Sequence, residues 1–445
     1  MTKQENDDNR HHPNVPSLRF RGFTDPWQRK RLGEITRVVK RKNTDLVTSR
    51  PLTISAQYGM IDQTEFFSKV IASDDLRTYY LIERGEFAYN RSYSQDYPWG
   101  TIKRLDKYDS GALSTLYTCF ALKGIESEFM VHYFETTKWY KQIQMIAAEG
   151  ARNHGLLNIP SSDFFDTYHI LPSSLAEQEK IGTFFRALDE LIAAREEELE
   201  KLRQMKAALL DAMFPSDAPM ERVTSATAHT LYDSLLDHTL REWNIVPSET
   251  CTPHTPRLRF RGFTDPWQRT QLGNVFHLKT DRVDLRDLST VRYISTEDML
   301  QDFQGVTPSS NPPMSYSVVR FSKGDILMAN IRPYLKKVWL ADSEGGCSTD
   351  VIVFSPKDSH SSRFLYHELA NDRFIEYVMD GAQGIKMPRG NKETMKDYTL
   401  YVPSLAEQKQ IGAFFRSQDE GIATATELID KLKRIKQACL KQMFV

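Results

Sequence analysis

The string LRFRGFTDPWQR occurs twice in this chain, at Leu18–Arg29 and at Leu258–Arg269, without a mismatch. A second string, SLAEQ, begins at Ser174 and again at Ser404, and each copy is followed by Ile-Gly and Phe-Phe-Arg at the same spacing. The segments between these strings are hardly alike. Two constant frames around two unlike interiors predict one fold used twice, with a different surface in each copy.

Weaker matches hold the register inside the interiors. Ile54-Ser55 matches Ile294-Ser295, and Gly85-Glu86-Phe87 resembles Gly324-Asp325-Ile326. We therefore expect the interiors to be diverged copies of one fold.

Each interior has the pattern of a mixed strand and helix domain. Short β-rich runs at Val351–Phe354 and Thr399–Val402 lie between Gly, Pro, Asn and Asp turns and predict strands. The stretches Phe129–Ala148 and Arg363–Val378 carry apolar residues three to four positions apart, which predicts helices.

A long helix is predicted to begin at each closing string. Ser174 with Glu177, and Ser404 with Glu407, have the spacing of a capping box. Apolar residues then recur at steps of three and four, a coiled-coil pattern over about five heptads. These are Ile181, Phe184, Leu188, Ile192, Leu199, Leu202, Met205, Leu209 and Met213 in the first helix, and Ile411, Phe414, Ile422, Leu428, Leu432, Ile435, Cys439 and Met443 in the second.

Neither helix can bury such an apolar face alone. A helix of ~38 residues is roughly 57 Å long, and each helix leaves its interior at the helix N-terminus. We expect the two helices to pair with each other in antiparallel orientation. The alternative is that each helix packs on its own interior.

Composition limits the remaining possibilities. The chain has 445 residues, is 40% hydrophobic and 26% charged, and has a formal net charge of −1. No apolar run approaches the ~20 residues of a membrane helix, and the polar N-terminus lacks the apolar core of a signal peptide. The four cysteines form no CxxC pair, so a reducing cytoplasm fits best. The low net charge does not exclude nucleic acid, because basic patches are local.

The doubled LRF-x-GFTDPW-x-x-x-x-LG opening and the PSLAEQ-x-x-I-x-x-FF closing helix resemble the specificity subunit of type I restriction-modification enzymes. The resemblance covers the chain from about Pro16 to Val445. It implies two target-recognition domains, each specific for one half of a bipartite site in double-stranded DNA. It also implies two methylation subunits per chain and, for cleavage, restriction subunits.

The predicted fold class is α+β, with two pseudo-symmetric mixed domains separated by two long antiparallel coiled-coil helices. The expected order is a disordered tail (1–15), the first recognition domain (16–171), the first helix (172–215), a linker containing a short helix near Leu231–Trp243 (216–256), the second recognition domain (257–402) and the second helix (403–445).

Duplex DNA is bound by Lys and Arg at phosphates and by Arg, Lys, Asn or Gln at base edges. Basic residues interleaved with Tyr, Asn and Gly predict the contacts in each half. The candidates in the first half are Asn90, Arg91, Tyr93, Lys103, Arg104, Arg152, Asn153 and His154. Those in the second half are Asn330, Arg332, Tyr334, Lys336, Lys337, Gln383, Lys386, Arg389, Asn391 and Lys392.

The duplicated strings are less suited to sequence-specific contacts, because they are identical in the two halves. Trp27 and Trp267 are expected to be core residues that join each frame to its interior. The duplicated arginines at positions 19, 21, 29, 259, 261 and 269 could contact the DNA backbone or a methylation subunit, or could serve shared packing. These alternatives stay open at this level.

No catalytic pattern was found in the sequence. Asn311-Pro312-Pro313-Met314 resembles an adenine methyltransferase motif, but Met314 stands where that motif has an aromatic ring, so a turn is expected. A glycine-rich cofactor loop, a phosphate loop and a zinc-ligand cluster are missing as well. We expect a non-catalytic subunit with no cofactor and no metal. The alternatives are a silent cassette that donates sequence by recombination, and an enzyme that modifies DNA itself.

Overall fold

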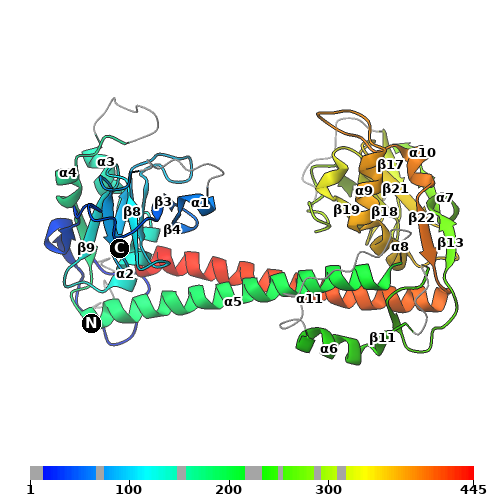
Figure 1. Ribbon diagram of the computed structural model, residues 1–445, viewed down its shortest axis with the longest axis horizontal. Coiled ribbons are helices and arrows are strands. Elements are labelled where there is room, and N and C mark those ends of the chain that lie inside the picture. Colours follow the sequence, from blue (N-terminus) through cyan, green and yellow to red (C-terminus); the bar gives the residue numbers. More distant parts are fainter. Residues whose placement is uncertain are drawn as a thin grey trace, which may run out of the picture. The chain divides into compact units, whose positions relative to one another are not determined.

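The computed structural model describes residues 14–66, 75–147, 157–215, 233–248, 254–284, 292–307 and 317–445. The chain forms two compact units (Figure 1). Unit 1 consists of Met1–Glu196 and Leu428–Val445, and unit 2 of Glu197–Glu427. Each unit therefore contains one β-rich domain, the beginning of the helix that follows it, and the end of the other long helix.

Two four-stranded sheets form the β-rich part of unit 1. Strands β2 (Thr36–Val38), β9 (Thr118–Leu122), β6 (Phe87–Asn90) and β7 (Thr101–Arg104) make one sheet in that order. Strands β4 (Gly59–Asp62), β3 (Pro51–Ser55), β8 (Ser110–Leu113) and β5 (Tyr80–Glu83) make the other.

Unit 2 repeats this arrangement. Its first sheet has the order β14 (Phe276–Lys279), β21 (Val351–Pro356), β18 (Ile326–Ala329), β19 (Val338–Leu340). Its second has the order β15 (Arg282–Asp284), β17 (Ser317–Phe321), β20 (Gly345–Cys347), β16 (Tyr293–Ile294).

The two copies differ at the edge of the second sheet. In both units a parallel pair, β3 with β8 or β16 with β20, is extended by one antiparallel strand, β5 or β17. The fourth strand of unit 1, β4, then pairs with β3, whereas that of unit 2, β15, pairs with β17. The matching Ile54 and Ile294 lie in the equivalent strands β3 and β16, so the interiors are diverged copies of one fold, as predicted.

Short helices complete each domain. Unit 1 has α1 (Gln63–Phe66), α2 (Ser127–Glu135), α3 (Tyr140–Ile146) and α4 (Ser161–Phe165), and unit 2 has α7 (Leu272–Val275), α8 (Ser362–Leu369), α9 (Asp372–Asp380) and α10 (Lys392–Lys396). The helices predicted at Phe129–Ala148 and Arg363–Val378 are each divided in two, into α2 and α3 and into α8 and α9. The Thr136 hydroxyl bonds back to the carbonyl of Tyr133 and ends α2, and the Asn371 side chain accepts from the Arg373 amide and starts α9. Such side-chain caps compete with a continuous helix.

In each unit a short antiparallel strand pair joins the end of the duplicated opening string to the segment just before the closing string. Strand β1 (Gln28–Arg31), at the end of the first duplicated string, pairs with β10 (Tyr168–Leu171). Strand β13 (Gln268–Gln271) pairs with β22 (Thr399–Val402) in the same way. Unit 2 contains an additional helix and strand pair. Helix α6 (Asp233–Glu242) is followed by β11 (Ile245–Pro247), and β11 pairs with β12 (Leu258–Phe260). Helix α6 lies within the predicted short helical stretch.

The two long helices are α5 (Leu175–Met213) and α11 (Leu405–Met443). They run side by side in opposite directions (Figure 1), as the ion pairs between them show. Lys433 bonds Glu196 at 2.7 Å in unit 1, and Lys206 bonds Asp419 at 2.5 Å in unit 2. The predicted antiparallel pairing is confirmed.

The predicted apolar seam of α11 needs one correction. Leu428 and Ile435 are 40% and 41% exposed, whereas Ile429 is buried. At these two places the covered residue lies one position later than predicted, whereas Ile411, Phe414 and Met443 are buried as predicted. The seam includes Lys436, whose charge is paired with Asp189 of α5 at 2.6 Å.

Candidate nucleic-acid interface

The first part of the candidate interface is the loop between β18 and β19 in unit 2. Pro333–Leu335 forms a single 3-10 turn, and the residues on either side of it, Arg332 and Lys336, have φ of 53° and 54°. Arg332 and Tyr334 are exposed, and the Tyr334 side chain reaches solvent at the tip of the turn. Left-handed backbone is unfavourable for such residues and collects at functional sites.

A hairpin forms the second part. The backbones of Gln383 and Arg389 exchange two hydrogen bonds of 2.9 Å, and the chain turns between them at Gly384, where φ is +92°. The Arg332 amide donates to the carbonyl of Pro388 at 2.8 Å, and the Gly390 amide donates to the carbonyl of Asn330 at 3.2 Å. The two predicted segments are therefore one continuous structure.

We define residues 330–337 and 383–392 as the basic surface. They contain six Lys and Arg residues and no Asp or Glu, in a chain whose formal net charge is −1. Three of the cationic side chains are bound by neighbouring groups in the fold. Lys336 pairs with Asp372 at 2.9 Å, Arg389 pairs with Asp350 at 3.1 Å, and Lys337 donates to a backbone carbonyl. In the part of the chain that the structure describes, the exposed side chains of Arg332 and Lys386 have no such partner.

Backbone strain gathers beside this surface. Six described residues other than glycine have a positive φ, and four of them, Asp302, Phe303, Arg332 and Lys336, lie at this place. The Phe303 amide donates to the Lys336 carbonyl at 2.9 Å, and the Asp302 amide to the Leu335 carbonyl at 3.2 Å. The surrounding structure thus enforces an unfavourable conformation where the cations are presented.

The remaining predicted residues of this half support the loops from inside. Asn391 caps α10 by accepting from the Glu393 amide at 3.0 Å, and Asn330 is mostly covered. Lys392 is half-buried. The exposed part of the surface is therefore formed by Arg332, Tyr334, the hairpin tip and Arg389.

In unit 1 the equivalent edge is used differently. Asn90 ends β6, and Arg91 donates to the carbonyls of Ile159 and Leu116, both at 2.9 Å. The Leu157 amide in turn donates to the Arg91 carbonyl. Arg91 therefore ties three segments together with its guanidinium, while Tyr93 is 43% exposed. The predicted residues Arg152, Asn153 and His154 lie outside the described residues, as does the predicted turn at 311–314.

Lys103 and Arg104 lie on β7, away from that edge. Arg104 is bound by Asp106, Ser127 and Glu128 and is 12% exposed. Burial lowers the pKa of Lys103, which is near the charges where α2 meets the long helices. The structure does not bring these two residues together with Asn90 and Tyr93.

The duplicated frames form the same ion pair in each unit. Arg19 donates to both carboxylate oxygens of Glu177, at 2.6 and 2.8 Å, and Arg259 does the same with Glu407 at 2.7 and 2.8 Å. The opening string is thus bonded to the first turn of the closing helix.

This pair also corrects the predicted capping box. The hydroxyls of Ser174 and Ser404 accept from the Glu177 and Glu407 amides as expected. The glutamates, however, bind arginine, which settles the role of Arg19 and Arg259 as packing of the frame.

Other duplicated residues complete the joint. Gln178 and Gln408 each donate to a proline carbonyl and accept from the amide of the residue that caps α2 or α8, Glu126 or Ser361. Trp27 and Trp267 are 1% and 5% exposed, so the expectation that they are core residues is confirmed. Among the other arginines, Arg29 covers the ring of Tyr168 at 3.9 Å.

Two core residues were missed by the sequence analysis. Phe444, after the end of α11, packs on Trp27, Phe129 and Phe185 in unit 1, with ring centroids 6.4, 5.3 and 5.7 Å away. Phe214, after the end of α5, packs on Trp267, Phe364 and Phe415 in unit 2 at 6.4, 5.2 and 6.0 Å. The signal was present, because Met213-Phe214 recurs as Met443-Phe444 at the same offset of the closing strings.

One group of side chains has the composition of a metal site. His132, Glu135 and Asp189 bring their ligand atoms within 4.8 Å of one another. Lys436 lies among them, 2.9 Å from Glu135 and 2.6 Å from Asp189, and so supplies the cation. Burial alone would raise the pKa of Glu135, but His132 and Lys436 hold it at about 2. Unit 2 has an equivalent group of His367, Asp419 and Lys206. In both units the lysine of one long helix pairs with the aspartate of the other, so the group stabilises the contact between the two helices.

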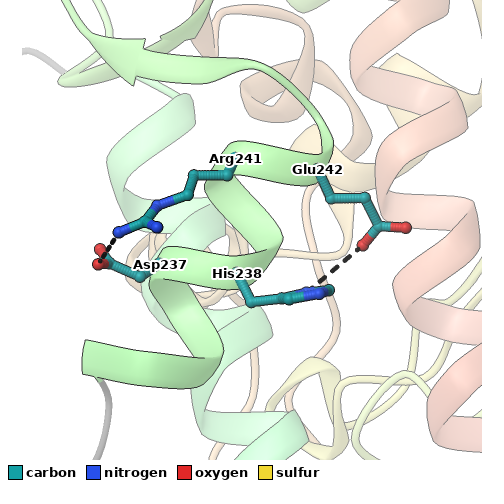
Figure 2. A pocket seen from close by; sticks show the side chains of 4 residues that line it. All are labelled: Asp237, His238, Arg241 and Glu242. Carbon is teal, nitrogen blue, oxygen red and sulfur yellow. Dashed lines mark hydrogen bonds and ion pairs between the residues drawn. The ribbon is translucent and has the colours of Figure 1, made fainter.

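The open hollow beside α6 does not resemble a catalytic site. Asp237, His238, Arg241 and Glu242 line it, all from one face of one helix (Figure 2). Arg241 pairs with Asp237 at 3.0 Å and His238 with Glu242 at 3.9 Å, each within the helix. These are ordinary surface pairs one turn apart.

Among the described helices, α5 and α11 are the longest, and neither they nor any other is apolar over a length that would cross a membrane.

The two units contain diverged copies of one domain, the two long helices pair with each other, and unit 2 carries the basic surface. Residues 264–434 match the sequence model of the family described as type I restriction modification DNA specificity domain. Over these residues, which are less than half of its length, the chain is similar to the DNA specificity domain of type I restriction-modification systems.

Curated relatives match the chain over limited lengths. The chain is 30% identical over 92 residues to the type I restriction enzyme EcoDI specificity subunit of Escherichia coli, an alignment that spans 20% of each protein. It is 32% identical over 91 residues to a Mycoplasma pneumoniae sequence assigned to the C-terminus of a type I specificity subunit, which spans 19% of this chain and 59% of that sequence. Both alignments thus span less than two thirds of the relative.

The fold is similar over nearly the whole length to a solved structure. The crystal structure of the S subunit of a type I restriction-modification system from M. genitalium has a TM-score of 0.56 and 14% identity, and the match covers 97% of this chain and 99% of that one. At this identity the likeness concerns the fold alone.

Proposed function

We propose that this chain binds double-stranded DNA and supplies the sequence specificity of a type I restriction-modification complex, with each unit specific for one half of a bipartite target. The observation that carries this proposal is the basic surface of unit 2. Six cations without an intervening acidic residue lie on two bonded loops, in a chain with no excess of positive charge. A local basic patch is the electrostatic footprint of a nucleic-acid site.

The residues of the basic surface divide between two tasks. Arg389 is held by Asp350, so its guanidinium has a defined direction, which suits contact with the edge of a guanine. Arg332 and Lys386 are exposed and suit phosphate contacts that position the unit on the duplex. Gln383 and Tyr334 extend the same exposed face.

In unit 1 the equivalent contacts are assigned to the loop after β6. Tyr93 is exposed, and Arg91 fixes the loop because its guanidinium donates to two backbone carbonyls and its own carbonyl accepts from the Leu157 amide. Arg152, Asn153 and His154 belong to the same proposal on sequence grounds. Lys103 and Arg104 contribute less, because their charges are already engaged within unit 1.

The long helices are proposed to act as the spacer between the half-sites and as the docking platform for two methylation subunits and for restriction subunits. Leu428 and Ile435 support this role, because they lie one heptad apart on α11 and are exposed although apolar. A cytoplasmic location, beside DNA and those subunits, is part of the proposal.

The test is methylation mapping in cells that carry variants of the basic surface. Arg389→Gln is expected to relax the sequence requirement in one half-site only, whereas Lys386→Gln is expected to weaken binding about equally for all sequences. Lys323→Gln, which removes an exposed lysine of unit 2 outside the surface, is the matched control. With purified complex, each lost phosphate contact should lower the slope of log affinity against log salt by about 0.9.

Several outcomes would contradict the proposal. A change in both half-sites from one substitution would exclude the division between units. So would a chimaera with residues 258–402 of another family member if it altered both half-sites or neither. Methyl transfer by the purified chain from S-adenosylmethionine would make it an enzyme. A host genome without any bipartite methylation that depends on this gene would favour a silent cassette.

A further inference from the structure

One side chain of the basic surface has no role in the fold. Ile385, at the tip of the hairpin, has a relative exposure of 101%, and Met387 two residues later is 51% exposed. Isoleucine is among the residues most often buried in proteins, and here two apolar side chains are exposed together on one short loop. The pair is therefore available to a partner, and the charges around it indicate of which kind.

The hairpin holds this tip away from the unit on a fixed base. Gln383 and Arg389 are joined by two backbone hydrogen bonds, and Pro388, which is buried, accepts from Arg332. Gly384 supplies the left-handed turn that directs the chain outward. The tip therefore projects an apolar side chain from a clamped loop.

Cations surround the tip. Lys386 follows Ile385 directly, and Arg332 and Arg389 lie at the base. An apolar projection among cations does not suit an apolar protein partner, because the cations would lose their hydration without compensation. It does suit duplex DNA, in which phosphates flank each groove and the stacked bases between them are apolar. Isoleucine and methionine are among the side chains that DNA-binding proteins insert between base pairs.

We propose that Ile385 enters the duplex at the half-site of unit 2 and partly separates two stacked base pairs, with Met387 covering the exposed base edge. This inference rests on the proposed function. Lys386 and Arg332 would hold the phosphates on either side of the opened step. Because pyrimidine–purine steps unstack most easily, this contact would select the sequence at a position where no hydrogen bond to a base is needed.

The experiment uses the full-length chain in complex with its methylation subunit and a duplex that carries the target found by methylation mapping. The fluorescent base 2-aminopurine is placed at each position of the half-site in turn. Its emission should rise on binding at one step, and Ile385→Ala should remove this rise and weaken binding by about tenfold, since it deletes most of the inserted apolar surface. Ile385→Leu, which retains an apolar side chain of the same size, should keep the rise.

Two controls separate the causes. Met145→Ala removes another side chain that is 73% exposed, at the end of α3 in unit 1, and should change neither affinity nor emission. Lys386→Gln should weaken binding and reduce its salt dependence, but the emission of the saturated complex should stay.

Emission that is unchanged by Ile385→Ala in the saturated complex would overturn this inference and leave the proposed function standing. So would loss of the methylation subunit from the complex in that variant, because Ile385 would then be a protein contact. Failure of the unmodified complex to prefer its target over a scrambled duplex would instead overturn the proposed function.

Discussion

The frame ion pair of unit 2 allows a quantitative test by the substitution Arg259→Met. The guanidinium donates to both oxygens of Glu407 and, at 2.6 Å, to the carbonyl of Asp265. The side chains of Arg259 and Glu407 are only 6% and 1% exposed. Methionine fills a similar volume, so the substitution leaves a buried carboxylate without its partner and creates little cavity.

Breaking a buried pair on one side costs about 3–5 kcal/mol, because the remaining charge stays out of water without compensation. At roughly 2–4 °C of Tm per kcal/mol for a unit of this size, the Tm of unit 2 should fall by about 6–20 °C. Replacing both partners, as Arg259→Met with Glu407→Gln, removes the stranded charge and should recover most of the loss.

Hydrogen-exchange mass spectrometry along a urea series measures the free energy of opening for each unit separately. Arg261→Met is the matched control, because Arg261 belongs to the same duplicated string but is exposed, and it should change stability by less than about 0.5 kcal/mol. The argument fails if Arg259→Met costs no more than this control, or if the double variant is no more stable than the single one.

Two further predictions concern the cores. Phe214→Ala should destabilise unit 2, and Phe444→Ala should destabilise unit 1, by about 3–5 kcal/mol each. Hydrogen exchange should rise in the unit that carries the substitution, and the exposed Leu428→Ala should have a much smaller effect. A rise in the other unit instead, or an equal effect of Leu428→Ala, would contradict the packing described. Burial raises the pKa of Glu368 to about 7, against the weaker influence of Arg373 and Tyr398. Because the folded pKa lies above the unfolded one, this glutamate contributes stability at low pH that is lost as pH rises from about 4.5 through 7. Glu368→Gln should therefore be more stable than the unmodified chain at pH 8, by about 3 kcal/mol at most, and the two should converge at pH 4; urea unfolding at both pH values decides this.

The sequence predicted the repeat and the paired helices well, because both leave periodic marks. The role of the duplicated arginines could not be predicted. Arg19 and Arg21 are neighbours in one string, yet one is buried against Glu177 and the other exposed. Only the position of the closing helix, more than a hundred residues away in the chain, distinguishes them.

The register of α11 shows a second limit. Leu428 and Ile429 are both apolar, and steps of three and four fit either of them. The partner helix decides, and it accepts Lys436 in the seam because Asp189 and Glu135 neutralise that charge. A pattern of apolar residues cannot include a lysine whose burial depends on a distant carboxylate.

The candidate site divides in the same manner. In unit 2 the composition indicated two separate loops, and only the structure shows that they are bonded together. In unit 1 the equally basic Arg91 and Arg104 serve the interior, bonded to backbone carbonyls and to nearby acidic groups. Composition records the charge of a side chain but not whether the fold has already used it.

The frame ion pairs have a consequence for inheritance. In each unit Arg19 or Arg259 bonds a glutamate of the closing string, so these contacts join one constant segment to another and involve no residue of the variable interior. A crossover between two such genes within the duplicated strings would therefore regenerate both contacts in the hybrid protein. The new chain would obtain a different variable domain in a single genetic event, with the contacts that hold the domain in place already matched.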